Sequence, residues 1–142
     1  FSGGESITIQ ADGADAEDAV PVHSSVSGRV TAVTQCRIGR ESVPCIEIQP
    51  DGRQVLSDSC VPPVLKKRED LIAAAKNAGC VGLGGSGKPT HLKLNAAARF
   101  DMLILNGAEC ETDISSDMRM IMEHGEDIVN GAEMIMKLMK TI

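Results

Sequence analysis

A glycine-rich segment near the middle of the chain carries its densest chemical signal. Residues 82–90 read Gly-Leu-Gly-Gly-Ser-Gly-Lys-Pro-Thr, with glycine at four of the first six positions. Because glycine has no Cβ, the backbone N–H groups of such a loop can converge on an anion. Residues 90–94 are typical of the start of a helix, whose N-terminus favours a phosphate. The segment therefore predicts a phosphate-binding loop, with an ordinary connector as the alternative.

Two chemistries are compatible with this loop. With Lys88 after Gly87, residues 82–88 nearly match the G-x-x-x-x-G-K pattern of a nucleotide hydrolase. That site needs Ser or Thr next to hold magnesium, and Pro89 has neither a hydroxyl nor an N–H. The segment before the loop, 68–79, also predicts a short helix with a glycine cap rather than a buried strand. The alternative pattern, G-x-G-G-x-G followed by a strand, suits the phosphate of a flavin or a dinucleotide.

A second group of polar residues follows a short apolar run. Asp101–Leu105 predicts a buried strand, and Asn106, Glu109 and Glu111 come directly after it. Two helices are then predicted, over about 116–123 and 126–140. The second has an apolar stripe that indicates core packing rather than a partner groove, formed by Ile128, Val129, Ala132, Ile135, Met136 and Met139.

The elements that position these residues fall into two parts. Short alternating runs at 6–10, 30–33 and 43–49 predict strands, and no Met occurs among them. All seven Met and the predicted helices follow the pair Pro62-Pro63, which disfavours helix and suits a connector. We therefore expect an α+β chain with a small antiparallel β unit over 1–62 and an α/β unit over 63–142.

Composition excludes several classes of function. The 142 residues carry 14 basic and 20 acidic side chains, a net charge of −6, which argues against nucleic-acid and anionic-membrane surfaces. Without Trp or Tyr, base-stacking platforms are excluded as well. Five cysteines without a C-x-x-C motif argue against a zinc or iron–sulfur motif and favour reduced thiols. No apolar run approaches the ~18 residues of a membrane span. We expect no metal site and a cytoplasmic location.

The glycine loop and the polar loop together resemble one known family. Residues 82–93, Gly-Leu-Gly-Gly-Ser-Gly-Lys-Pro-Thr-His-Leu-Lys, are similar to the GxGGxGFPTxxK loop of the FMN- and NADH-binding subunit family of respiratory complex I. Residues 103–111, Leu-Ile-Leu-Asn-Gly-Ala-Glu-Cys-Glu, resemble the LIxNGAECEP pattern of the C subunit of the Rnf electron-transport complex. Residues 20–33 are similar to the N-terminal barrel-sandwich part of that subunit. The resemblance spans about residues 20–140, and relatives also feed electrons to proline reductase.

This resemblance implies a barrel-sandwich-like β unit followed by a partial Rossmann-like unit that binds FMN and NADH. It implies that glycines of the loop contact the FMN phosphate and NADH, that a lysine neutralises phosphate charge, and that polar side chains contact the flavin or its ribityl chain. Those residues are Gly82, Gly84, Gly85 and Gly87, then Lys93, then Asn106, Glu109 and Glu111. No side chain is expected to act as a catalytic acid or base, because the isoalloxazine does the chemistry.

The implied activity is electron transport from NADH through FMN toward iron–sulfur clusters or a partner reductase. Relatives continue with the rest of the nucleotide fold, a ubiquitin-like part and a cysteine-rich cluster domain, so we expect the chain to be a part of such an oxidoreductase subunit and to be inactive alone. The expected partners are other electron-transfer subunits, through which the protein would lie against the inner face of a membrane. Lys88 stands where the family has Phe, and Thr112 stands where it has Pro.

Two other functions remain open at the level of sequence. One is a carrier or interaction domain of the biotinyl–lipoyl type, suggested by the β unit, although residues 24–28 contain no Lys to carry such a group. The other is a phosphate-binding nucleotide domain, which Pro89 weakens.

Overall fold

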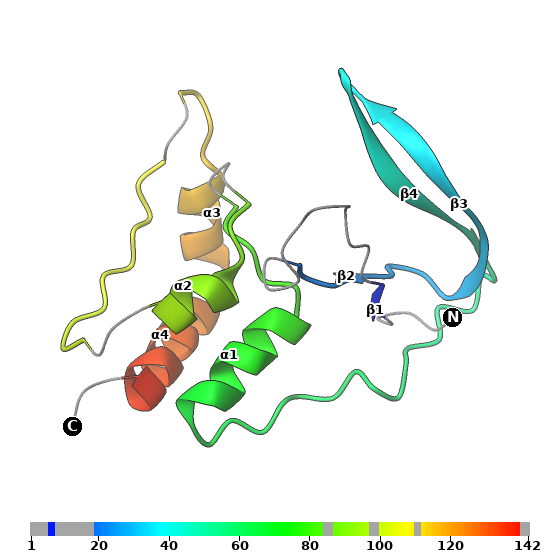
Figure 1. The fold of residues 1–142 in the computed structure, drawn as a ribbon. Helices are drawn as coiled ribbons and strands as arrows, with labels where there is room; N and C mark the ends of the chain where they lie inside the picture. The colour runs from blue at the N-terminus through cyan, green and yellow to red at the C-terminus, as the bar shows by residue number, and fades with distance from the viewer. Residues whose placement is uncertain (1–5, 8–18, 84–86, 97–99, 110–111, 140–142) are drawn as a thin grey trace. The chain divides into compact units, whose positions relative to one another are not determined.

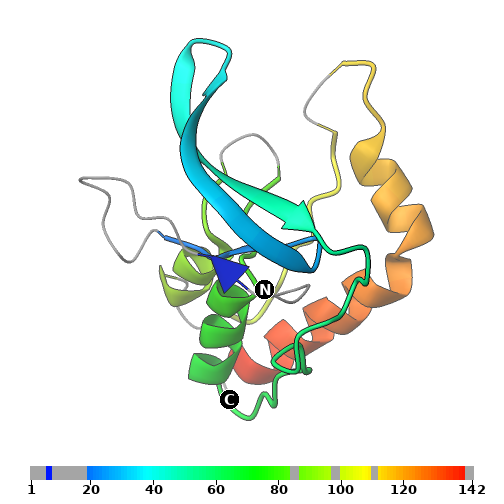
Figure 2. The same cartoon turned by 90° about the vertical axis from the view of Figure 1, so that its right-hand side faces the viewer.

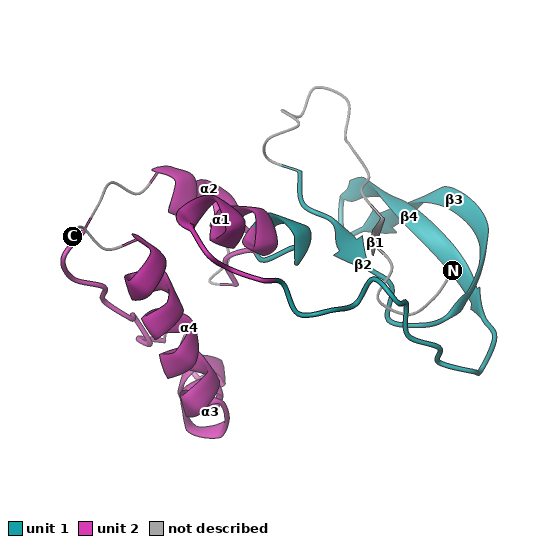
Figure 3. Ribbon diagram, turned by 90° about the horizontal axis from the view of Figure 1, so that it is seen from below, with its two compact units in different colours: residues 1–63, 76–80 teal, residues 64–75, 81–142 magenta. Residues whose placement is uncertain are grey.

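The computed structural model describes residues 6–7, 19–83, 87–96, 100–109 and 112–139. These residues form four strands and four helices (Figure 1). By contacts between backbones, the chain divides into two compact units (Figure 3). Unit 1 contains 1–63 and 76–80, and unit 2 contains 64–75 and 81–142. The division after Pro63 falls at the proline pair, and the end of the first helix is grouped with the strands.

Unit 1 consists of two antiparallel pairs of strands. Strand β1 (Ser6–Ile7) pairs with β2 (Val22–His23), and β3 (Gly28–Ile38) pairs with β4 (Glu41–Pro50). The second pair is a long twisted hairpin (Figure 2). It contains both runs that alternation predicted, at 30–33 and 43–49, and it extends beyond each of them. Of the predicted strand at 6–10, residues 8–10 lie outside the described residues.

Close backbone approach at Gly28 and the hydrogen bonds of Ser27 hold the open end of the hairpin. Gly28 lies so close to the Gln49 carbonyl that a Cβ at this position would overlap it. Ser27 is 2% exposed, and its Oγ donates to Asp51 Oδ1 at 2.6 Å and accepts from the Val55 N–H at 3.1 Å. The Asp51 N–H in turn donates to the Ser27 carbonyl. Hydrogen bonds therefore close the hairpin where it joins the rest of unit 1.

Unit 2 is built on helices. Helix α1 (Arg68–Asn77) starts in this unit, and Asp70 Oδ2 accepts bonds from the Lys66 and Lys67 N–H groups before its first turn. Helices α2 (Thr90–Ala96), α3 (Ser116–Glu123) and α4 (Gly125–Met139) follow. The predicted bounds agree for α3, differ by one residue at each end for α4 and by two at the end of α1, and for α2 only the start at residues 90–94 was predicted. Leu71 and Met139 are the apolar side chains with less than about a tenth of their surface exposed among the described residues.

The apolar stripe of α4 is only partly covered. Met139 is 4% exposed, and the other stripe residues are partly buried except for Val129, which is 53% exposed. The prediction that this stripe packs in a core is therefore confirmed at Met139, whereas the rest of the stripe keeps part of its surface exposed.

One predicted element is wrong. Residues 101–105 were expected to form a buried strand, but they have no strand pairing, and Met102 and Ile104 are 73% and 79% exposed. A strand needs a neighbour to satisfy its backbone N–H and C=O groups. Among the described residues, both sheets lie in unit 1 and none is parallel. The apolar sequence is present here without the partner strand that burial requires.

Candidate functional site

The chain turns sharply between α1 and the glycine loop. Gly79 has φ +67°, and its N–H donates to the Lys76 carbonyl at 2.9 Å, which ends α1 as the sequence predicted. A Cβ at Gly79 would overlap the carbonyl oxygen of Pro21 within unit 1. This position therefore requires glycine both for its backbone conformation and for its close contact.

The base of the glycine loop is closed by its own backbone. Val81 and Pro89 form an antiparallel bridge, and the Gly82 N–H donates to the Lys88 carbonyl at 2.9 Å. Gly87 has φ +59°, a conformation that favours glycine, and an added Cβ there would meet no atom within 4 Å. Gly84 and Gly85 lie outside the described residues. The sequence therefore folds here into a loop pinned at both ends.

The element before the loop distinguishes it from a P-loop. A P-loop joins a strand to a helix, whereas here helix α1 and a short link lead into residue 82. The side chain of Lys88 is exposed.

Helix α2 follows the loop directly and is held from its far end. The Arg68 guanidinium donates to the carbonyls of Leu94 and Asn95 at 3.0 and 2.9 Å. These are last-turn carbonyls, where a positive charge also stabilises the helix dipole. Lys93 is exposed, and its N–H donates to the Pro89 carbonyl at 3.5 Å. Arg68, which sequence reasoning did not single out, thus fixes the helix that carries Lys93.

The polar loop after residues 101–105 is ordered by its own side chains. Asn106 Oδ1 accepts from the Ala108 N–H at 3.0 Å, which forms an Asx turn. Gly107 lies against Ile121 of α3 so closely that a Cβ would overlap the Ile121 Cδ1. Asn106 and Glu109 are both exposed, and Glu111 lies outside the described residues.

Glu109 binds the start of helix α3. Its Oε2 accepts from the Asp117 N–H at 3.0 Å, and its Oε1 accepts from Ser116 Oγ at 3.3 Å. Ser115, at the N-cap position, makes no side-chain cap bond. The carboxylate therefore satisfies a first-turn N–H and opposes the positive end of the helix dipole. Sequence reasoning missed this cap because the carboxylate lies eight residues from the N–H that it accepts.

A groove borders the polar loop. It encloses about 460 Å³ and is mainly apolar. The polar loop, α3 and α4 line it with Leu105, Asn106, Gly107, Asp117, Met120, Ile121, Gly125, Ile128 and Val129. Its volume is within the range of about 300–1,000 Å³ that is common for cofactor sites. Of the predicted site residues, Asn106 lines the groove, whereas the backbone hydrogen bonds of Gly82 and Lys93 join residues of their own segment.

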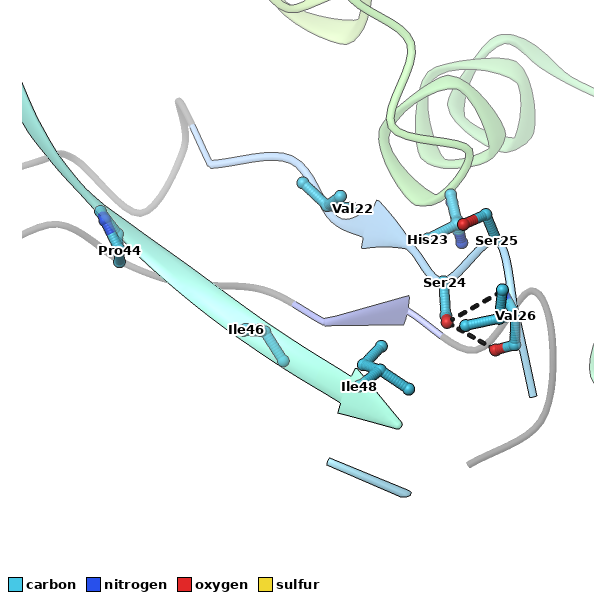
Figure 4. Close-up of a pocket in the computed structure, with 8 residues that line it drawn as sticks. All are labelled: Val22, His23, Ser24, Ser25, Val26, Pro44, Ile46 and Ile48. Carbon is cyan, nitrogen blue, oxygen red and sulfur yellow. Dashed lines mark hydrogen bonds between the residues drawn. The ribbon is translucent and has the colours of Figure 1, made fainter. Parts of the chain in front are cut away.

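Unit 1 has a pocket of its own, of about 440 Å³ (Figure 4). Strand β2, the turn after it and one face of β4 line it with Val22, His23, Ser24, Ser25, Val26, Pro44, Ile46 and Ile48. Ser24 Oγ donates to the Val26 carbonyl at 2.7 Å and accepts from the Val26 N–H, so this hydroxyl is used to shape the turn. The pocket therefore offers mostly apolar surface.

Metal-binding clusters and membrane-spanning helices are both missing from the described part of the chain. Within it, no group of three His, Cys, Asp or Glu side chains could hold a metal ion. None of its helices has both the length and the apolar character needed to cross a membrane.

Comparison with known proteins assigns this region to a family. Residues 75–141, which include the glycine loop and the polar loop, match the Nuo51 FMN-binding domain of the Complex1_51K family. No solved structure matches the chain.

Longer relatives match both units. The C subunit of the Na⁺-translocating ferredoxin:NAD⁺ oxidoreductase complex from Acetobacterium woodii is 38% identical over 124 residues, which are 83% of this chain and 28% of that protein. The C subunit of the ion-translocating oxidoreductase complex is 36% identical in Serratia proteamaculans and 38% identical in Rhodobacter capsulatus. These alignments cover 85% and 78% of this chain, and 18% and 22% of those proteins.

The chain thus spans less than a third of the length of these relatives. It belongs to the family of the C subunits of Rnf-type oxidoreductase complexes, and its residues 75–141 match an FMN-binding domain.

Proposed function

We propose that the chain is the FMN-holding part of an electron-transfer subunit that accepts electrons from NADH and passes them to iron–sulfur clusters or to a partner reductase. The observation that carries the proposal is the closed base of the glycine loop, at Gly82 and Lys88, inside the region that matches an FMN-binding domain. The iron–sulfur clusters and the partner subunits would belong to the rest of a longer protein and its complex.

The residues present fit the chemical groups of FMN. The phosphate needs N–H donors and positive charge, which a pinned glycine loop and the exposed Lys93 can supply. The flat ring system needs an apolar surface with a few polar groups, as in the groove beside Asn106. When bound, FMN supplies the exchange of a hydride for single electrons. The chain binds and orients it.

We assign distinct tasks to the proposed residues. The backbone of Gly82, Gly84, Gly85 and Gly87 surrounds the phosphate, and Lys93 offsets its charge. Asn106, Glu109 and Glu111 face the ribityl chain or the polar edge of the flavin, because carboxylates would repel the phosphate. Both Glu109 oxygens are bonded to α3. Glu109 therefore contacts the ribityl chain only by sharing or leaving that cap.

A titration of FMN tests this proposal. Bound FMN is followed by the anisotropy of its own fluorescence, which the chain leaves bright because it has no Trp or Tyr to quench a flavin. We expect Gly85→Val to weaken FMN binding by at least about tenfold, or about 1.4 kcal/mol, because a branched Cβ fills the space where backbone approaches phosphate. Gly131→Ala on α4 is the control. If Gly85→Val binds FMN as the parent does, the loop is only a connector.

Substitutions at Lys88 distinguish a flavin site from the P-loop of a nucleotide hydrolase. Lys88→Phe restores the residue found in the family and should keep FMN binding, whereas a P-loop would lose its phosphate contact. Magnesium-dependent ATP binding by the parent, abolished in Lys88→Ala, would contradict the proposed function.

A further inference from the structure

The β3–β4 hairpin brings two cysteines onto one face. In its register Thr34 is opposite Cys45, and Cys36 is opposite Val43. Residues two apart on a strand share a face, so Cys36 lies on the same face as Thr34 and therefore as Cys45. The two cysteines are diagonal neighbours across the pair of strands.

The two thiols lie on one face of the hairpin and are not joined by a disulfide. Both are partly buried. The Cys36 Sγ also lies 4.0 Å from Thr34 Oγ1. Cys60 and Cys80 are exposed and lie outside the hairpin. Among the described cysteines, only Cys36 and Cys45 share a sheet face.

We propose that Cys36 and Cys45 form a thiol–disulfide site that exchanges with a low-molecular-weight disulfide such as glutathione disulfide. The Cys36 thiolate attacks one sulfur of glutathione disulfide, which forms a mixed disulfide and releases one glutathione thiolate. The Cys45 thiolate then attacks the Cys36 sulfur and releases the second glutathione. Two cysteine thiols are oxidised to one disulfide, glutathione disulfide is reduced to two glutathione molecules, and the two cysteine protons pass to these products.

The surroundings of the pair set the order of attack. Interaction with Cys36, first through hydrogen bonding, raises the pKa of the Cys45 thiol, and burial and the negative charge of Glu47 also raise it. The Thr34 hydroxyl lies 4.0 Å from the Cys36 Sγ and can donate a hydrogen bond to a thiolate there. Because the thiolate is the nucleophile, Cys36 attacks first and Cys45 resolves the mixed disulfide.

The hairpin also makes the disulfide easy to reduce. Diagonal neighbours in a sheet have Cα atoms roughly 7–8 Å apart, whereas disulfides join Cα atoms about 4.4–6.8 Å apart. Because paired strands already lie at hydrogen-bonding distance, closing the bond requires a local twist or shift along the strands, and strained disulfides have more oxidising potentials. A site of this kind responds reversibly to the glutathione pool rather than serving as a permanent crosslink.

Glutathione disulfide itself is the probe for the test. The chain is incubated with it, remaining thiols are blocked, and peptides are mapped by mass spectrometry. We expect a disulfide between Cys36 and Cys45 that reduced glutathione reverses. Cys45→Ser should accumulate a stable mixed disulfide on Cys36, and Cys36→Ser should form one on Cys45 at least about threefold more slowly. Cys80→Ser is the control and should leave the pair unchanged.

Two results would overturn the proposal. One is glutathione on Cys60 and Cys80 with no disulfide between Cys36 and Cys45. The other is equal rates of mixed-disulfide formation in Cys36→Ser and Cys45→Ser, which would remove the assigned order. Circular dichroism of each variant shows whether the hairpin is still folded, and hydrogen exchange at β3–β4 provides the same check in the oxidised parent.

Discussion

The two units of the molecule differ in how their backbone groups are paired and their apolar side chains are buried. In unit 1, each strand of the β3–β4 hairpin has its partner a few residues away, and Ser27 and Asp51 close the open end. In unit 2, residues 101–105 are as apolar as a buried strand, yet Met102 and Ile104 are exposed. A local sequence pattern therefore predicts structure well when the segment that it pairs with is close in sequence.

The largest expected effect tests whether the units are independent. Gly28→Val places a branched Cβ against the Gln49 carbonyl, and backbone cannot yield as a side chain can. We expect it to destabilise the hairpin by roughly 3 kcal/mol, measured by amide hydrogen exchange resolved along the chain. Helices α2–α4 should keep their protection. If they lose it together with the hairpin, the two units fold as one and the comparison fails.

A smaller effect is expected at the cap of α3. Glu109→Ala removes the acceptor of the Asp117 N–H and a negative charge from the helix N-terminus. We expect a loss of about 1 kcal/mol, seen as faster exchange in α3 with the hairpin unchanged. Glu123→Ala, at the other end of α3, removes only an exposed ion pair with Arg119 and is the matched control. Equal effects of the two changes would show that the Glu109 cap contributes nothing specific.

Replacing a glycine inside α4 should raise the stability of the helix rather than lower it. Gly131 lies in the helix with open space around an added Cβ. Gly131→Ala should stabilise α4 by about 0.5–1 kcal/mol, because alanine loses less backbone entropy on folding. Gly39→Ala in the hairpin turn also has open space but φ +62°, so it should destabilise unit 1. Circular dichroism during urea unfolding measures both. A loss in Gly131→Ala would indicate a contact on that face.

The smallest expected effect depends on pH. The bond from Ser27 Oγ lowers the pKa of Asp51 below its ordinary 3.8, and the Arg53 N–H lowers it further. The carboxylate therefore stabilises unit 1 above the ordinary pKa, and this stability is lost as pH falls through the lowered value. Asp51→Asn keeps an oxygen acceptor without the charge. The difference in stability between parent and variant should disappear in acid, and a difference that persists there would exclude this linkage.

The sequence predicted those helices and strands whose formation depends on neighbouring residues in the chain. The glycine end of α1, the helices after residue 115 and the alternating strands all follow from residues within one turn or one hairpin. It did not predict the exposure of residues 101–105, because burial of a strand depends on a neighbour distant in sequence. The backbone divides next to Pro63. The assignment of the two parts to a barrel-sandwich-like unit and an FMN-binding unit stays a prediction.

For the candidate site, sequence identified the residue types but not their bonds. It placed Asn106 and Glu109 in one polar loop, and both lie there. It could not show that Glu109 binds the start of α3 or that Arg68 holds the end of α2, since both contacts join distant positions. The roles of the glycines and Lys93 toward FMN stay predictions that the titration tests.

The β3–β4 hairpin has a consequence for how the chain folds as it is made. Its ladder joins residues no farther apart than Gly28 and Pro50, so little loop entropy is lost before contacts form. A hairpin closes in about 1–10 μs, whereas a ribosome adds about 5–20 residues per second. We therefore expect the hairpin to form once residue 50 has left the ribosome, before α3 and α4 have been synthesised, so that the last helices form after it.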